Sequence, residues 1–280
     1  MRVRAIAIAA AIVGLLGGTS SALASPGGQD SPGHYYLALG DSLAYGFQLG
    51  KFLAELPNVD AATFNTGYVD DFAAMVRAVQ DPLPTVNFGC PGETTASYFA
   101  GCAFSQSGGP LHNGYAGSQE AAALAFLRAH RGQAGLITLD NGANDLNSCL
   151  NSSDPACIPN ALARVGVNLN RALAELRAAA PSAEIIVMEY YDPLAFAIPI
   201  TVPAIQALNN VIATVAAAHG ARVADAFTPI NLAQPQPATL CALTLVCTAL
   251  HDVHASDAGY AVIAEQFWAA SSYSRQDQQN

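Results

Sequence analysis

The stretch Tyr35-Tyr36-Leu37-Ala38-Leu39-Gly40-Asp41-Ser42-Leu43 runs from an apolar, strand-like segment through a glycine turn to a serine. Four more short apolar runs follow along the chain, separated by longer segments with helical periodicity. Strands that alternate with helices are typical of an α/β domain with a parallel sheet. The predicted strands are Tyr35–Leu39, Thr85–Phe88, Gly135–Leu139, Glu184–Met188 and Arg222–Ala226.

The segments between these strands carry helix signals. Ser118 and Ser256 suit helix N-caps, and Gly220 suits a C-cap. No Pro- or Ser-rich linker divides the chain, so we expect one α/β domain over residues 35–272, with a disordered segment at 25–34 and a disordered polar tail at 273–280. The predicted helices are Asp70–Val79, Ser118–His130, Ala161–Ala179, Val202–His219 and Ser256–Ala270.

The N-terminus has the three parts of a secretory signal peptide. Arg2 and Arg4 precede an apolar run over residues 5–16, and the small residues Ala22-Leu23-Ala24 suit a cleavage site. The apolar run is shorter than the roughly 20 residues that span a bilayer, and no later segment looks long and apolar enough to do so. The sequence predicts a signal peptide at residues 1–24 and a secreted protein without stable membrane insertion.

The charge balance bears on possible partners. The chain has 11 basic and 21 acidic side chains and a formal net charge of −10. So negative a surface argues against nucleic acid or an anionic membrane as partner.

The 6 cysteines lie in three neighbouring couples. In an exported protein such cysteines are expected to form disulfides. The number of possible pairings is 15, and proximity alone favours the three local ones. These are Cys90 with Cys102, Cys149 with Cys157, and Cys241 with Cys247.

Four polar segments follow predicted strands or precede the last predicted helix. Gly40-Asp41-Ser42-Leu43 ends the first strand, at the edge where open α/β sheets bind ligands. Alone it is a weak signal, because most such serines only cap a helix. Gly92 and Asn144 lie in the turns after the second and third strands, and their N–H groups could form an oxyanion hole. His254 precedes the last helix and could reach the same edge.

These four segments, in this order and spacing, resemble the four blocks of the SGNH (GDSL) hydrolase family. The resemblance runs from about Leu37 to Phe267. It implies a flavodoxin-like three-layer α/β/α fold with a five-stranded parallel sheet in the order 2-1-3-4-5. It also implies a serine esterase or lipase. We expect no cofactor, a small-molecule or lipid acyl ester as substrate, and a monomeric protein.

The resemblance also implies a role for each residue. Ser42 is the expected nucleophile and His254 its base, while the Ser42 and Gly92 N–H groups and the Asn144 side chain form the oxyanion hole. The family's last block is usually Asp-x-x-His-Pro, but here His251 lies three residues before His254, and Ala255 replaces the proline. Either Asp252 or a backbone carbonyl could therefore orient the histidine, and Asp252 is the preferred candidate.

The sequence leaves several questions of function open. Loops at residues 44–68 and 97–115 could wall the acyl site, and their aromatic residues could line an apolar pocket. A pocket of that kind would fit a lipase, whereas a carbohydrate acetyl esterase needs only a small one. The pattern also allows a catalytically silent binding module on the same fold, or a metal-dependent hydrolase using His251, Asp252 and His254. The aromatic residues in question are Tyr45, Phe47, Tyr98, Phe99 and Phe104.

Overall fold

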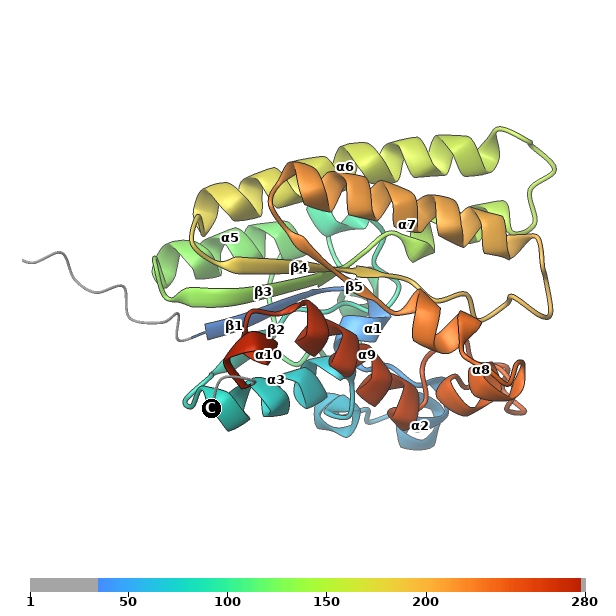
Figure 1. The fold of residues 1–280 in the computed structure, drawn as a ribbon, viewed down its shortest axis with the longest axis horizontal. Coiled ribbons are helices and arrows are strands. Elements are labelled where there is room, and N and C mark those ends of the chain that lie inside the picture. Colours follow the sequence, from blue (N-terminus) through green and yellow to red (C-terminus); the bar gives the residue numbers. More distant parts are fainter. Residues whose placement is uncertain (1–34, 278–280) are drawn as a thin grey trace, which may run out of the picture. The chain divides into compact units, whose positions relative to one another are not determined.

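A parallel sheet forms the centre of the computed structural model, which describes residues 35–277 (Figure 1). The strand order is β2-β1-β3-β4-β5, as the sequence predicted, and every neighbouring pair is parallel. β1, β3 and β4 are almost wholly buried, because a parallel sheet is covered on both faces. The strands are β1 Tyr35–Gly40, β2 Thr85–Asn87, β3 Ala134–Asp140, β4 Glu184–Glu189 and β5 Arg222–Asp225.

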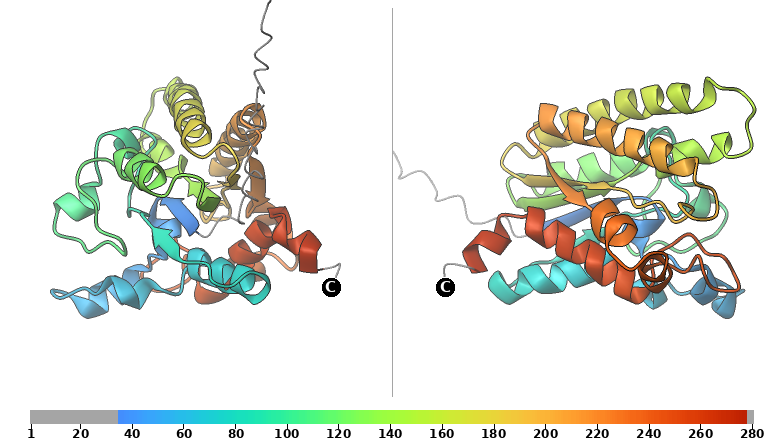
Figure 2. Two further views of the ribbon diagram at one scale, coloured as in Figure 1. Left: turned by 90° about the vertical axis from the view of Figure 1, so that its left-hand side faces the viewer. Right: turned by 45° about the vertical axis from the view of Figure 1, so that its right-hand side comes forward.

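Five long helices cover the two faces of this sheet. α5 Gln119–Ala129, α6 Cys157–Ala179 and α7 Thr201–Ala218 cover one face, and α3 Tyr68–Val79 and α9 Asp257–Ala270 cover the other (Figure 1). Figure 2 shows both helical layers with the sheet between them. The three-layer α/β/α fold is therefore confirmed.

Local sequence signals begin and end several of these helices. The side chain of Ser118 accepts a hydrogen bond from the Ala121 N–H, and that of Ser256 accepts one from the Gly259 N–H. Gly220 follows α7 with φ +61°, a conformation that favours glycine. The predicted caps are thus in place, and the predicted strands and helices agree with the structure to within a few residues.

Sequence reasoning missed the short elements that connect the long ones. It also placed a disordered tail at the C-terminus, whereas α10 continues to Asp277 and buries the ring of Tyr273. The missed elements are α1 Ser42–Tyr45, α2 Leu49–Glu55, η1 Ala61–Phe64, η2 Ser97–Phe99, α4 Ala103–Gln106, η3 Ala143–Cys149, η4 Thr228–Leu232, α8 Ala238–Leu243 and α10 Tyr273–Asp277.

One segment contradicts the expectation that nothing after residue 24 is long and apolar enough to span a membrane. By length and composition α7 could do so, with a mean hydropathy of 1.3. In the structure this helix packs on the sheet beside α6 and buries Leu208 and Ile212 (Figure 1). About 28% of the helix is buried in the structure, so this packing accounts for only part of its apolar composition.

Three disulfides join the cysteines in the pairs that proximity favoured. They are Cys90–Cys102, Cys149–Cys157 and Cys241–Cys247. The first closes the loop after β2, the second joins η3 to the start of α6, and the third lies at α8. Such bonds are typical of extracellular proteins in oxidising surroundings. The expected signal peptide and the segment at 25–34 lie outside the described residues.

Candidate functional site

Ser42 lies at the carboxyl edge of the sheet, at the first position of α1. The carboxylate of Asp41 caps this short helix by accepting a hydrogen bond from the Leu43 N–H at 2.9 Å. Gly40, one residue earlier, has φ +141°, and a Cβ atom there would lie 2.3 Å from the carbonyl oxygen of Asp140. Only glycine permits the close approach of β1 and β3 that presents the serine.

His254 reaches Ser42 from the loop before α9. Its Nε2 lies 2.9 Å from the Ser42 Oγ, and its Nδ1 lies 2.5 Å from the Asp252 Oδ1. The loop is held by the Leu245 N–H, which donates to the His254 carbonyl at 2.9 Å. A carboxylate only accepts hydrogen bonds, so the proton of the neutral ring lies on Nδ1 and Nε2 is free to accept the serine proton.

Asp252 is buried and ionised. Burial raises the pKa of its carboxyl, but the hydrogen bonds from the His254 ring and from the Leu49 N–H outweigh this effect, so the pKa lies below its ordinary value. The Leu49 N–H donates to Oδ2 at 2.7 Å, which leaves Oδ1 for the histidine. The structure thus places Asp252, and no backbone carbonyl, against Nδ1 of His254.

The residues that carry the three expected oxyanion donors, Ser42, Gly92 and Asn144, all line one cavity. Within the described part of the chain, the N–H groups of Ser42 and Gly92 have no hydrogen-bond partner. Asn144 Nδ2 donates to the Glu93 carbonyl at 2.9 Å and, over a longer 3.4 Å, to Asp41 Oδ2, so both of its N–H groups have partners. Gly92 has φ +80° with open space on its Cβ side, so backbone conformation rather than lack of room calls for glycine here.

Two buried polar residues that sequence reasoning missed brace this site. Gln119 accepts from the Gly40 N–H at 2.6 Å and donates to the Gly40 carbonyl at 2.9 Å and to Glu93 at 3.1 Å. Burial raises the pKa of Glu93 to about 7, although hydrogen bonds from Ser97 and Gln119 favour its ionised form. No local sequence pattern distinguishes these two from ordinary surface residues of a helix and a loop.

The turns after β2 and β3 are also joined to each other. The Thr95 N–H and hydroxyl donate to the two carboxylate oxygens of Asp145, at 2.8 and 2.7 Å. This pair fixes the turn that carries Gly92 against the one that carries Asn144. Asp145 therefore stabilises the position of the neighbouring Asn144, which explains why an aspartate follows the asparagine in this turn.

A cavity of about 750 Å³ opens beside Ser42, and its walls are mostly apolar. They come from η3, the start of α6, and the connection from β4 into α7. The loops at 44–68 and 97–115 were expected to form these walls, but of their aromatic residues only Phe47 lines the cavity. The apolar wall residues include Leu146, Leu150, Ile158, Leu194, Ile198, Ile200 and Ile205.

The remaining four predicted pocket residues have packing roles. Tyr45 and Tyr98 are fully buried. Phe104 packs against Tyr45, with ring centroids 5.7 Å apart, and the Arg171 guanidinium lies 4.0 Å from the Phe99 ring centre. The prediction was wrong for these residues because periodicity cannot tell an aromatic cluster beneath a loop from a cavity wall.

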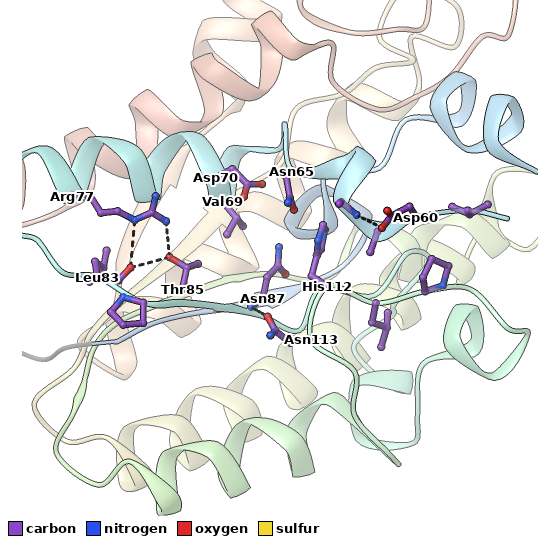
Figure 3. Close-up of a pocket in the computed structure, with 16 residues that line it drawn as sticks. Asp60, Asn65, Val69, Asp70, Arg77, Leu83, Thr85, Asn87, His112 and Asn113 are labelled. Carbon is purple, nitrogen blue, oxygen red and sulfur yellow. Dashed lines mark hydrogen bonds between the residues drawn. The ribbon is translucent and has the colours of Figure 1, made fainter.

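A second cavity, of about 840 Å³, lies between α3 and β2 and is also lined by residues from the segments 59–65 and 110–113 (Figure 3). Polar residues line much of it, and two of them hydrogen-bond backbone carbonyl groups of α1. His112 Nε2 donates to the Tyr45 carbonyl at 2.8 Å, and Asn87 Nδ2 donates to the Ala44 carbonyl at 2.7 Å. Neither Ser42 nor His254 lines this cavity, so the candidate site is the first one.

His251 lies apart from the site. Its Nδ1 donates to the Val246 carbonyl at 3.1 Å, and the side chain is exposed. Among residues 35–277 no group of three or more His, Cys, Asp or Glu side chains is placed to hold a metal ion. The proposed combination of His251, Asp252 and His254 is therefore not assembled.

A serine, a histidine and a carboxylate in one hydrogen-bonded series, beside unpaired N–H groups, are typical of serine hydrolases. The model of the GDSL-like lipase/acylhydrolase family matches residues 38–262 of this sequence. The chain therefore belongs to this family and is a hydrolase of ester bonds. A comparison with curated protein sequences found no match.

Solved structures support the same fold. The lipase Lip_vut3 from a goat rumen metagenome is 18% identical, with 85% of this chain and 97% of that chain covered and a TM-score of 0.57. The acetylxylan esterase Axe2 from Geobacillus stearothermophilus is 17% identical, with 85% and 94% covered and a TM-score of 0.57. At these identities the likeness concerns the fold alone.

Proposed function

We propose that this protein is a serine esterase that cleaves acyl esters through an acyl-enzyme, with Ser42 as nucleophile, His254 as base and Asp252 as the residue that orients the base. The observation that carries the proposal is the series of hydrogen bonds from Ser42 through His254 to Asp252 at the wall of an apolar cavity. The intact geometry of this hydrogen-bonded series also argues against a catalytically silent binding module on the same fold.

The reaction follows from these positions. Ser42 Oγ attacks the ester carbonyl carbon while its proton passes to His254 Nε2, and the carbonyl oxygen becomes negative. Collapse of this intermediate breaks the ester C–O bond, and His254 returns the proton to the departing alcohol. A water molecule, deprotonated by His254, then attacks the acyl-enzyme and releases the acid.

The oxyanion would be held by the two backbone N–H groups of Ser42 and Gly92, which are unpaired in the described chain. Asn144 would supply the third donor by turning the N–H that donates to Asp41 over 3.4 Å toward the oxyanion. The two backbone donors are fixed before the reaction, so they stabilise developing charge without reorganisation.

The cavity favours an apolar acyl chain over an acetyl group. An acetyl group fills only a small part of about 750 Å³. Several large apolar side chains of the cavity wall are also solvent-exposed, which would suit a substrate that covers them. They are Leu150, Ile198, Ile200 and Val253, with exposed fractions of 47, 42, 79 and 42%. We therefore propose medium- or long-chain fatty acyl esters as substrates, with carbohydrate acetyl esters as the alternative.

A chain-length series on the purified protein tests both parts of this proposal. p-Nitrophenyl acetate, octanoate and palmitate are compared with wild type, Ser42→Ala and the control Ser274→Ala, whose serine lies on α10. We expect Ser42→Ala alone to lose activity, and octanoate or palmitate to give the highest kcat/KM. Equal activity in Ser42→Ala would refute the nucleophile, and a preference for acetate would favour the carbohydrate esterase.

We also propose that the protein is secreted after removal of residues 1–24. The three disulfides support this, since the reducing cytosol disfavours such bonds. Mass spectrometry of protein from a culture medium would check the new N-terminus, expected at Ser25.

A further inference from the structure

Two carboxyl groups lie side by side beneath the turn that carries Ser42. Asp41 ends the turn after β1 and Asp140 ends β3, and the two side chains are 1% and 0% exposed. The Asp41 N–H donates to the Asp140 carbonyl at 3.0 Å and lies 3.3 Å from Asp140 Oδ2, so the two buried carboxyl groups are neighbours. The reaction proposed above uses neither group as acid, base or nucleophile.

A direct hydrogen bond between the two carboxyl groups requires a proton. Two ionised carboxylates can only accept hydrogen bonds, so a hydrogen bond between them needs one of the pair to be a carboxylic acid. Two adjacent charges without solvent would also repel each other strongly, as in pairs of carboxyl groups that share one proton. The buried pair therefore carries one negative charge.

The surroundings place the proton on Asp140. Burial, followed by the nearby charge of Asp41, raises the pKa of Asp140 well above its ordinary value. Burial also raises the pKa of Asp41, but this carboxyl accepts hydrogen bonds from the Leu43 N–H at 2.9 Å and the Tyr190 hydroxyl at 2.7 Å. Asp140 Oδ1 accepts from the Tyr68 hydroxyl at 2.7 Å, and its longer contacts to two N–H groups are 3.3 Å.

The remaining titratable groups around the pair fit this assignment. A protonated His254 would lower the pKa of Asp41, and Glu93 is a nearby carboxyl that is itself shifted toward its neutral form. The rest are tyrosines whose pKa burial raises, so they stay neutral. They are Tyr36 on β1, Tyr68 on α3, Tyr190 and Tyr191 after β4, and Tyr260 on α9.

We propose that Asp140 is a positioning residue that acts as a neutral carboxylic acid: it hydrogen-bonds Asp41 and so fixes the turn that presents Ser42. Its Oδ2 lies 3.3 Å from the N–H groups of Asp41 and Ala44, on both sides of the serine. Gly40 lacks a side chain because the Asp140 carboxyl occupies that space, with Oδ1 2.3 Å from the position of a Cβ atom. The effect on activity rests on the proposed function, whereas the protonation state does not.

The remaining charge on Asp41 has a use in the same reaction. It caps α1 directly before Ser42, and its Oδ2 lies 3.4 Å from Asn144 Nδ2, one of the proposed oxyanion donors. A second charge on Asp140 would push the Asp41 carboxylate away from these contacts. A neutral Asp140 therefore keeps the nucleophile and the oxyanion donor in one fixed arrangement.

Infrared difference spectra test the protonation directly. The spectrum of wild type minus Asp140→Asn, at neutral pH, should contain the carbonyl stretch of a protonated carboxylic acid. Asp252→Asn is the matched control, because Asp252 is buried but ionised and its difference spectrum should contain carboxylate bands instead. Carboxylate bands for Asp140 would overturn the proposal, whatever the activity of the protein.

The positioning role is tested by the kinetics of two variants. Asp140→Ala should lower kcat by about 10²-fold with little change in KM, since a displaced nucleophile loses its alignment. Asp140→Asn should restore most of that loss, because its amide can donate to Asp41 and accept from Tyr68. If both variants keep the wild-type near-ultraviolet circular dichroism and Asn is as damaged as Ala, the neutral-acid role is refuted. Activity that survives in Ser42→Ala would instead remove the proposed function and leave the infrared result standing.

Discussion

The contact between Asp252 and His254 gives the sharpest test of the proposed site. Asp252→Asn should lower kcat/KM for p-nitrophenyl octanoate by about 10⁴-fold, or about 5.5 kcal/mol of barrier. The physical reason is the tautomer of His254. An amide can donate to Nδ1, which moves the ring proton to Nε2, and Nε2 then cannot accept the proton of Ser42 at 2.9 Å.

The loss should appear mainly in kcat, because Asp252 does not line the cavity. Asp257→Asn is the control: this exposed carboxylate on α9 bonds Lys51 and Gln48 but does not contact His254. It should stay within about twofold of wild type, the usual range for a surface change without a catalytic contact. A fall of less than tenfold in Asp252→Asn would mean that another group orients His254, and the reasoning from tautomers would be wrong.

Three more substitutions test the same geometry. Asn144→Ala should lower kcat by about 10²–10³-fold, as measured by burst kinetics, and an unchanged kcat would remove it from the oxyanion hole. Glu93 holds its proton in the folded state up to a pKa of about 7, against 4.5 ordinarily, so the free energy of unfolding should fall as pH rises between these values. Denaturant titrations should show this slope flattened in Glu93→Gln, and an equal slope would contradict the burial argument. Ile200→Ser should lower activity on emulsified long-chain esters but not on dissolved short-chain ones, while Val167→Ser, at a similarly exposed position away from the cavity, should change neither.

The sequence determined the fold because each element has its own local signal. The strand residues of β1 and β3 are apolar and fully covered, and Ser118 and Ser256 bond the first turns of their helices regardless of the rest of the chain. The order of the four blocks then predicted that Ser42, Gly92, Asn144 and His254 meet, since the carboxyl ends of parallel strands share one edge.

Tertiary structure decided everything that depends on contacts between distant segments. The cavity beside Ser42 is walled by residues 143–158 and 190–205, which adjoin only after the sheet has formed, so its lining was assigned to the wrong loops. Asp140 and Glu93 look like ordinary turn residues in the sequence. Their pKa values are set by burial and by neighbours such as Tyr68 and Gln119, and burial is a property of the packed chain rather than of any local pattern.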